Sequence, residues 1–238
     1  MLLSFVAMQI KLLAENGKAS GAMQEITTKR IYDIQSVVYD HTFGQLVKRR
    51  VETAIRHMRI RQNDLVLDLG IGTGASLNYF PTDKGRIVGI DLSSGMLRMC
   101  KEKIAESGRS NVNVFQANAL ELPFDDNTFD QVFISHVISV VSDPVQLVKE
   151  AQRVAKSGAR ILILNHFQST NRLIALIEKW LCPLCTHLGW RTDLPLQDLI
   201  RRTGMEIDYR FKLDAIDLWE TVAITNNKSA LRGELAMA

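Results

Sequence analysis

Short continuous apolar runs alternate with stretches of helical spacing from about residue 64 onward. These runs have the length of β-strands, and they cover 64–69, 86–91, 111–116, 129–135 and 159–165. Strands that are apolar throughout and separated by helices predict a parallel sheet covered on both faces. Two more strands, 206–211 and 218–225, follow a helical insertion near 168–200, so the pattern predicts an α/β fold with seven mostly parallel strands.

Helical spacing is also present ahead of the first strand. Residues 29–59 predict two helices that are interrupted near 40–44. Directly after the first strand, residues 75–80 are expected to open another helix. We therefore divide the chain into an N-terminal helical segment, 1–60, and one sheet domain, 61–238, which contains the insertion.

Capping residues indicate where two of the later helices begin and end. Ser93 or Ser94 can cap the helix after the second strand, and Gly108 is a stop signal for it. The helix predicted at 143–155 has Asp143 as its cap and Pro144 in its first turn.

Composition limits the classes of function. The 238 residues are 46% hydrophobic and carry a net charge of +3, without the long basic runs of a nucleic-acid-binding protein. Three cysteines fit a reducing compartment better than a disulfide framework. Cys182 and Cys185 with His187 raise the alternative of a metal or redox site, but we interpret them as apolar cysteines at a helix end and expect no metal.

Two features of the N-terminal segment indicate contact with a membrane surface. No run reaches the roughly 18 to 20 apolar residues that span a bilayer, yet residues 1–18 are rich in leucine and other apolar side chains. Three interpretations of this segment remain. It lies in a membrane interface, it packs on the protein as a helix, or it is an extension that precedes the true translation start at Met8 or Met23. A basic cluster follows, which is either a solvated helix face or a surface for anionic lipid: Lys48, Arg49, Arg50, Arg56, Arg59 and Arg61.

A glycine-rich turn follows the first strand in DLGIGTGAS, residues 68–76. Its glycines, Gly70, Gly72 and Gly74, allow a tight turn that a ligand can approach closely. Asp91 ends the second strand about 20 residues on, where a carboxylate can accept both hydroxyls of a ribose. Asp68 inside the turn suits a cofactor with an amino group and a sulfonium better than a pyrophosphate.

The sequences VLDLGIGTG, GIDLSSGML, NALELPF and FDQVFISHVI resemble, in order and spacing, the motifs of class I S-adenosylmethionine (SAM)-dependent methyltransferases. The resemblance implies a Rossmann-like fold with an N-terminal helical lid, SAM as cofactor and S-adenosylhomocysteine as product. It implies that the methionine part is held by Asp68, Gly70, Gly72 and Gly74, the ribose by Asp91, and the adenine by Leu92, Met96 and Asn118, with Ala119 also at the cofactor. Ser135 and His136 would line the sulfonium end. Asn118 stands where many relatives carry an aspartate, and its carbonyl can still accept from the adenine amine.

The methyl acceptor is indicated by three other stretches. The fourth strand ends without the Asn/Asp-Pro-Pro-aromatic sequence of enzymes that methylate adenine or glutamine amino groups, which favours a small or lipidic acceptor. The pattern Y-x6-Y-D-x2-F-G at 32–44 is similar to the N-terminal motif of the bacterial phosphatidylethanolamine N-methyltransferases. LNHF at 164–167 and LGWRTDLP at 188–195 agree with that family.

This resemblance implies roles for five residues. Tyr32 and Tyr39 would offer hydroxyls and ring faces to the headgroup, and Arg191 a fork to its phosphate. His136 and His166 are candidates for accepting the amine's proton or orienting the headgroup, although water can carry the proton away. Alternatively, the tyrosines are packing residues and Arg191 forms a surface ion pair.

We expect a cytoplasmic enzyme at the inner face of the cell membrane, attached peripherally to a phospholipid surface through anionic lipid, and without an obligatory protein partner. Two alternatives remain open at this stage. One is a methyltransferase for a small soluble or quinone-like acceptor, and the other is a non-catalytic SAM-binding module.

Overall fold

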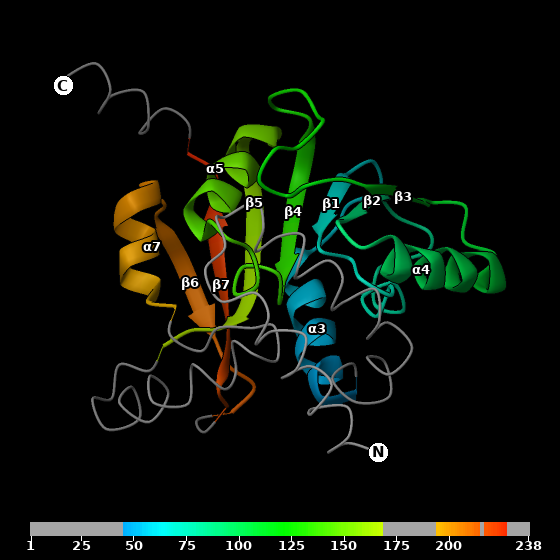
Figure 1. Cartoon of the computed structure of the whole chain (residues 1–238), viewed down its shortest axis with the longest axis horizontal. Helices are drawn as coiled ribbons and strands as arrows, with labels where there is room; N and C mark the ends of the chain where they lie inside the picture. Colours follow the sequence, from blue (N-terminus) through cyan, green and yellow to red (C-terminus); the bar gives the residue numbers. More distant parts are fainter. Residues whose placement is uncertain (1–44, 169–193, 215–216, 228–238) are drawn as a thin grey trace, which may run out of the picture.

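The computed structural model describes residues 45–168, 194–214 and 217–227. Seven strands form one sheet in the order β3-β2-β1-β4-β5-β7-β6 (Figure 1). The strands are β1 (Leu65–Leu69), β2 (Arg86–Asp91), β3 (Val112–Gln116), β4 (Phe129–Ser135), β5 (Ala155–His166), β6 (Ile207–Phe211) and β7 (Trp219–Thr225). The predicted Rossmann-like, seven-stranded fold is therefore confirmed.

The strand directions place the described candidate residues at one edge of the sheet. Strands β1 to β5 pair in parallel, whereas β7 runs antiparallel between β5 and β6. The chain moves outward from β1 to β2 and β3, then returns to β4 on the other side of β1. Ligands of such sheets bind beyond the carboxyl ends of the strands at this reversal point.

Helices cover both faces of the sheet, as expected. Helices α3 (Gln45–Met58) and α4 (Ser94–Ser107) contribute apolar side chains to one core cluster. Helices α5 (Pro144–Val154) and α7 (Leu196–Thr203) contribute to the other. In Figure 1, α7 lies beside β6 at one end of the sheet and α4 beside β3 at the other.

The predicted helix caps are confirmed. The Ser93 hydroxyl accepts from the amide of Met96, and Gly108 ends α4 in the left-handed conformation with φ 63°. The Asp143 carboxylate accepts from two amides in the first turn of α5. These are local interactions within a few residues, which is why the sequence predicts them well.

The helix expected at 75–80 is wrong, because residues 72–79 form hydrogen-bonded turns. In an α-helix the carbonyl of Leu77 would accept from residue 81, which is Pro81 and has no N–H. The guanidinium of Arg109 donates to the carbonyls of Leu77, Phe80 and Pro81 instead. The fifth strand also begins earlier than predicted, at Ala155, directly after α5.

Residues 1–44, which include the expected lid at 32–44, and residues 169–193 of the insertion lie outside the described residues, as does the C-P-L-C sequence. Of the helices that the structure does describe, none combines the length and the apolar character needed to cross a membrane.

Candidate cofactor and acceptor site

The glycine turn after β1 requires its glycines for two different reasons. Gly70, Gly72 and Gly74 all have positive φ, at 75°, 57° and 80°. A Cβ on Gly70 would lie 2.7 Å from the Cβ of Val137, so this glycine allows the turn to pack against the loop after β4. Among the described residues, a Cβ on Gly72 would meet only the Gly70 carbonyl oxygen within 4 Å, at 3.9 Å. In the part of the chain that the structure describes, the turn is therefore packed at its start and open to a ligand at its middle.

The Asp91 carboxylate joins this turn to the end of β2. One oxygen accepts from the amide of Gly72 at 3.0 Å, and the other accepts from the amide of Ser93 at 2.8 Å. The amides of Gly70 and Ile71 both donate to the carbonyl of Ile90. The carboxylate predicted to bind the ribose is thus held in place by backbone groups from two loops.

Asp68 is the most deeply buried acid of the site, with 1% of its surface exposed. Its Oδ2 accepts from the Ser76 hydroxyl at 2.6 Å, while no group in the described part of the chain donates to the buried Oδ1. Burial raises the pKa of Asp68 to about 7; the Ser76 hydrogen bond opposes this, and the nearby Asp91 adds to it.

The unfilled acceptor position on Asp68, in the same motif as Gly72, fits the amino-acid end of SAM. A buried carboxylate oxygen needs a donor, and an ammonium supplies both N–H groups and positive charge. The two carboxylates and the glycine turn thus match the cofactor implied by the sequence.

The residues expected to contact adenine follow β2 and β3. Leu92 is half-buried, and its carbonyl accepts from the side chain of Gln116 at 2.9 Å. Met96 is buried in the first turn of α4. Asn118 caps a turn through its Oδ1, which accepts from the amide of Leu120, and Ala119 packs in the core.

Ser135 and His136 lie where β4 ends. Ser135 is the last residue of the strand, and the amide of His136 donates to the carbonyl of Leu164 on β5. His136 has φ 58°, a left-handed conformation that is uncommon outside glycine. The residue keeps some exposed surface, but its Nε2 is buried. Burial, assisted by the charge of Arg50, lowers the pKa of His136 to about 3.

His166 ends β5 beside an aromatic side chain. Its Nδ1 lies 2.7 Å from the carbonyl oxygen of Leu218. In the antiparallel ladder His166 pairs with Trp219, the first residue of β7. The indole of Trp219 makes edge contacts with both His166 and His136, at centroid distances of 6.2 and 6.5 Å. The two candidate histidines are therefore brought together by a third ring.

Arg50 of α3, which the sequence groups with the basic cluster, joins this group instead, with its side chain 18% exposed. Its guanidinium lies 4.4 Å from the centre of the Trp219 ring. It also donates to both carboxylate oxygens of Asp217, with Nη2 to Oδ1 at 2.7 Å. Burial alone would raise the pKa of Asp217, but hydrogen bonds from Arg50 and from the amide of Trp219 hold it below its usual range.

Sequence reasoning missed four residues of this arrangement: Ser76, Arg50, Asp217 and Trp219. The glycine motif contains Ser76, so its hydroxyl could have indicated a partner for Asp68. The other three residues are far from the glycine motif in the sequence, and they reach the site because β7 begins beside the end of β5. The predicted Tyr32, Tyr39 and Arg191 lie outside the described residues.

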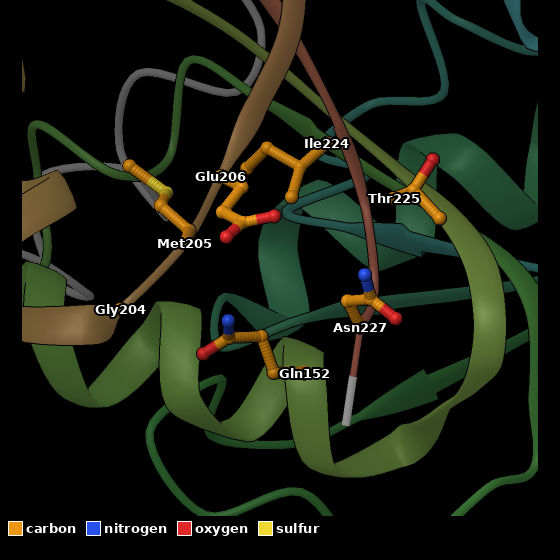
Figure 2. Close-up of a pocket in the computed structure, with 7 residues that line it drawn as sticks. All are labelled: Gln152, Gly204, Met205, Glu206, Ile224, Thr225 and Asn227. Carbon is orange, nitrogen blue, oxygen red and sulfur yellow. The ribbon is translucent and has the colours of Figure 1, made fainter. Parts of the chain in front are cut away.

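A pocket lies away from this site, where β7 ends (Figure 2). It is a small pocket between α5, the turn after α7 and the end of β7, lined by residues that include Gln152, Met205 and Thr225. It shares no residue with the glycine turn or the histidine group, so it takes no part in the arrangement described above.

Comparisons with known proteins agree with this geometry. Residues 67–163 match the family described as "Methyltransferase domain". The chain is 33% identical over 171 residues to a phosphatidylethanolamine N-methyltransferase of Cereibacter sphaeroides, covering 71% of this chain and 83% of that protein. It is also 33% identical over 171 residues to a demethylmenaquinone methyltransferase of Thermobifida fusca, covering 71% of this chain and 68% of that one.

Solved structures show the same fold. A SAM-dependent methyltransferase from Aquifex aeolicus superposes with a TM-score of 0.58 at 21% identity, covering 73% of this chain and 88% of that one. With the glycine turn, the two carboxylates and the strand order, these relationships establish SAM as the cofactor. The chain belongs to the class I S-adenosylmethionine-dependent methyltransferases, and within them it resembles the bacterial phosphatidylethanolamine N-methyltransferases.

Proposed function

We propose that this enzyme methylates the amino group of phosphatidylethanolamine and of its partly methylated derivatives, toward phosphatidylcholine. The observation that carries the proposal is the likeness to the Cereibacter protein. At the same identity and aligned length, the chain covers 83% of that relative but only 68% of the demethylmenaquinone methyltransferase. The Y-x6-Y-D-x2-F-G, LNHF and LGWRTDLP stretches, at 32–44, 164–167 and 188–195, add support.

Bound SAM supplies the methyl group from its sulfonium, so the protein's task is to hold and orient the two reactants. Asp68, the glycine turn and Asp91 would hold the cofactor at the carboxyl ends of β1 and β2. His136 and His166 lie at the next two carboxyl ends, beside the position of the acceptor.

The two histidines differ as proton acceptors. The pKa of His136 at about 3 makes this ring a neutral polar group and a weak base near pH 7. If Nδ1 of His166 donates to the Leu218 carbonyl, its Nε2 is left as an acceptor nitrogen. The low pKa of His136 disfavours this ring as the group that receives the proton the amine must lose, which leaves His166 or water as candidates.

A peripheral attachment to anionic lipid belongs to the same proposal. On α3 the apolar side chains of Val47 and Val51 are buried, while Lys48, Arg49 and Arg56 are exposed. These cations are available to a negatively charged surface at the inner face of the cell membrane. Cosedimentation with phosphatidylglycerol vesicles should therefore weaken as salt is raised, and binding that is indifferent to both salt and lipid charge would contradict this part.

The second candidate is methylation of a quinone-like acceptor, which the Thermobifida relative's name suggests. The deciding experiment gives the enzyme radiolabelled SAM with vesicles of phosphatidylglycerol alone, with added phosphatidylethanolamine, or with added demethylmenaquinone. We expect labelled mono-, di- or trimethylated phospholipid in the second mixture. Label in the quinone alone would replace the proposal, and cofactor binding without label in any mixture would support a non-catalytic module.

A further inference from the structure

The aromatic side chain at the start of β7 lies at the acceptor end of the site. Trp219 pairs in register with His166, and its ring has edge contacts with His136 and His166, which come from two different strands. The loop that carries His136 also packs against the glycine turn, because the Cβ of Val137 lies 2.7 Å from the position that a Cβ on Gly70 would take. The three rings therefore form one wall beside the loop that packs on the cofactor turn.

The orientation of Trp219 is fixed from two directions. Its backbone amide donates to Oδ1 of Asp217 at 3.1 Å, and the same carboxylate receives Arg50. The guanidinium then covers the ring at 4.4 Å. A cation held by a buried carboxylate over an aromatic face stabilises one ring position, so the indole does not rotate freely at the mouth of the site.

The charge of Arg50 has a second effect on this wall. It adds to burial in lowering the pKa of His136, so its field acts where an acceptor amine would enter. A positive field favours the neutral form of an amine over its ammonium form. Only the neutral amine has the electron pair that attacks the methyl group.

We propose that Trp219 is a positioning residue for the methyl acceptor, and that Arg50 and Asp217 hold its indole in place. The inference rests on the proposed function for the identity of the acceptor. The indole and the two imidazoles set how far the amine enters toward the cofactor turn.

The test compares Trp219→Ala and Trp219→Phe with Phe115→Ala, a control that removes a half-exposed ring on β3 at 51% exposure. The readouts are kcat and KM for phosphatidylethanolamine in mixed vesicles, and the dissociation constant of S-adenosylhomocysteine by calorimetry. Trp219→Ala should raise KM or lower kcat about fivefold or more, in line with the interaction energy of one aromatic contact. Trp219→Phe should recover most of that loss, and cofactor binding should stay within about twofold in every variant.

Two results would overturn the inference. One is unchanged kcat and KM in Trp219→Ala; the other is a loss of S-adenosylhomocysteine binding that parallels the loss of activity, which indicates a structural role. The wild-type enzyme separates this from a failure of the proposed function. If it labels demethylmenaquinone and not phospholipid, the phospholipid assignment fails, and the same comparison with the quinone decides whether Trp219 positions the acceptor.

Discussion

Arg50 and Asp217 stand 167 positions apart in the sequence, yet they form a bidentate ion pair with Nη2 and Oδ1 separated by 2.7 Å. The Asp217 side chain is 1% exposed and that of Arg50 18%. The pair joins α3, which belongs to the N-terminal segment, to the start of β7 and therefore to the acceptor side of the site. One buried carboxylate thus connects an N-terminal helix with a C-terminal strand.

Removing one partner of the Arg50–Asp217 pair should lower the free energy of unfolding. Asp217→Asn leaves a largely buried guanidinium without its counter-charge, and we expect a loss of about 3 kcal/mol in the free energy of unfolding. The double variant Arg50→Gln/Asp217→Asn should lose less than the sum of the single variants, as measured by urea unfolding. The control is Arg56→Gln on the same helix, whose partner is Glu52 and whose side chain is 76% exposed; its effect should stay within about 0.5 kcal/mol. Additive losses in the cycle would argue against a coupled pair.

The start of the glycine turn should not tolerate a side chain. Gly70→Ala introduces a Cβ at 2.7 Å from Val137 in addition to the strain of φ 75°. Gly158→Ala isolates the strain, because its φ is 77° and no described atom lies within 4 Å of the added Cβ. We expect Gly158→Ala to cost about 1 to 2 kcal/mol and Gly70→Ala to cost more and also weaken S-adenosylhomocysteine binding. Equal losses in stability and unchanged cofactor binding would contradict the packing role.

Asp91 should contribute to cofactor binding through the backbone that it holds. Asp91→Asn replaces one acceptor oxygen by an NH₂ group, which faces the amide of Gly72 or of Ser93. Hydrogen bonds to a charged group contribute about 1.5 to 3 kcal/mol, so the affinity for S-adenosylhomocysteine should fall about tenfold or more. Calorimetry measures it, with the exposed Asp83→Asn as control. An affinity equal to that of the wild type would remove Asp91 from the site.

Cofactor binding should release a proton from Asp68. The carboxyl is largely protonated below its pKa of about 7 in the cofactor-free protein, and a bound ammonium would lower that pKa. Near pH 6 the binding enthalpy of S-adenosylhomocysteine should therefore depend on the ionisation enthalpy of the buffer, and Asp68→Asn should abolish that dependence. Binding without proton release in the wild type would contradict the assignment.

Asp68 should also make the stability of the cofactor-free protein depend on pH. Between its ordinary pKa of 3.8 and the folded value of about 7, the folded state binds more protons than the unfolded state. The contribution of Asp68 to the free energy of unfolding therefore falls as pH rises through this window. Asp68→Asn should remove this fall, which urea unfolding at pH 5 and pH 8 can show.

His136 should make the stability depend on pH in the opposite direction from Asp68. Its pKa is lowered from 6.5 to about 3, so below pH 6.5 the unfolded state takes up a proton that the folded state does not. Stability should decline as pH falls from 6.5 toward 3. His136→Asn removes this contribution, and asparagine tolerates the left-handed backbone at φ 58°. An unchanged acid slope in the variant would mean that the ring is not buried as described.

The sequence determined the elements whose causes are local. Continuous apolar runs predicted the strands, and the capping of α4 by Ser93 and of α5 by Asp143 was readable because a cap acts within three residues. The glycine turn and Asp91 were recognisable because the turn, the strand after it and the carboxylate keep a fixed spacing in this fold. These features depend on neighbours along the chain.

The tertiary structure decided the rest. Residues 72–79 form turns because Pro81 has no N–H for the carbonyl of Leu77, and Arg109, from beyond α4, donates to that carbonyl and to the carbonyl of Pro81 instead. Arg50, Asp217 and Trp219 meet only because α3 packs on the sheet and β7 runs antiparallel beside β5. Contacts between residues so far apart depend on how elements pack, since each is set by the summed burial of many side chains and no local pattern encodes it.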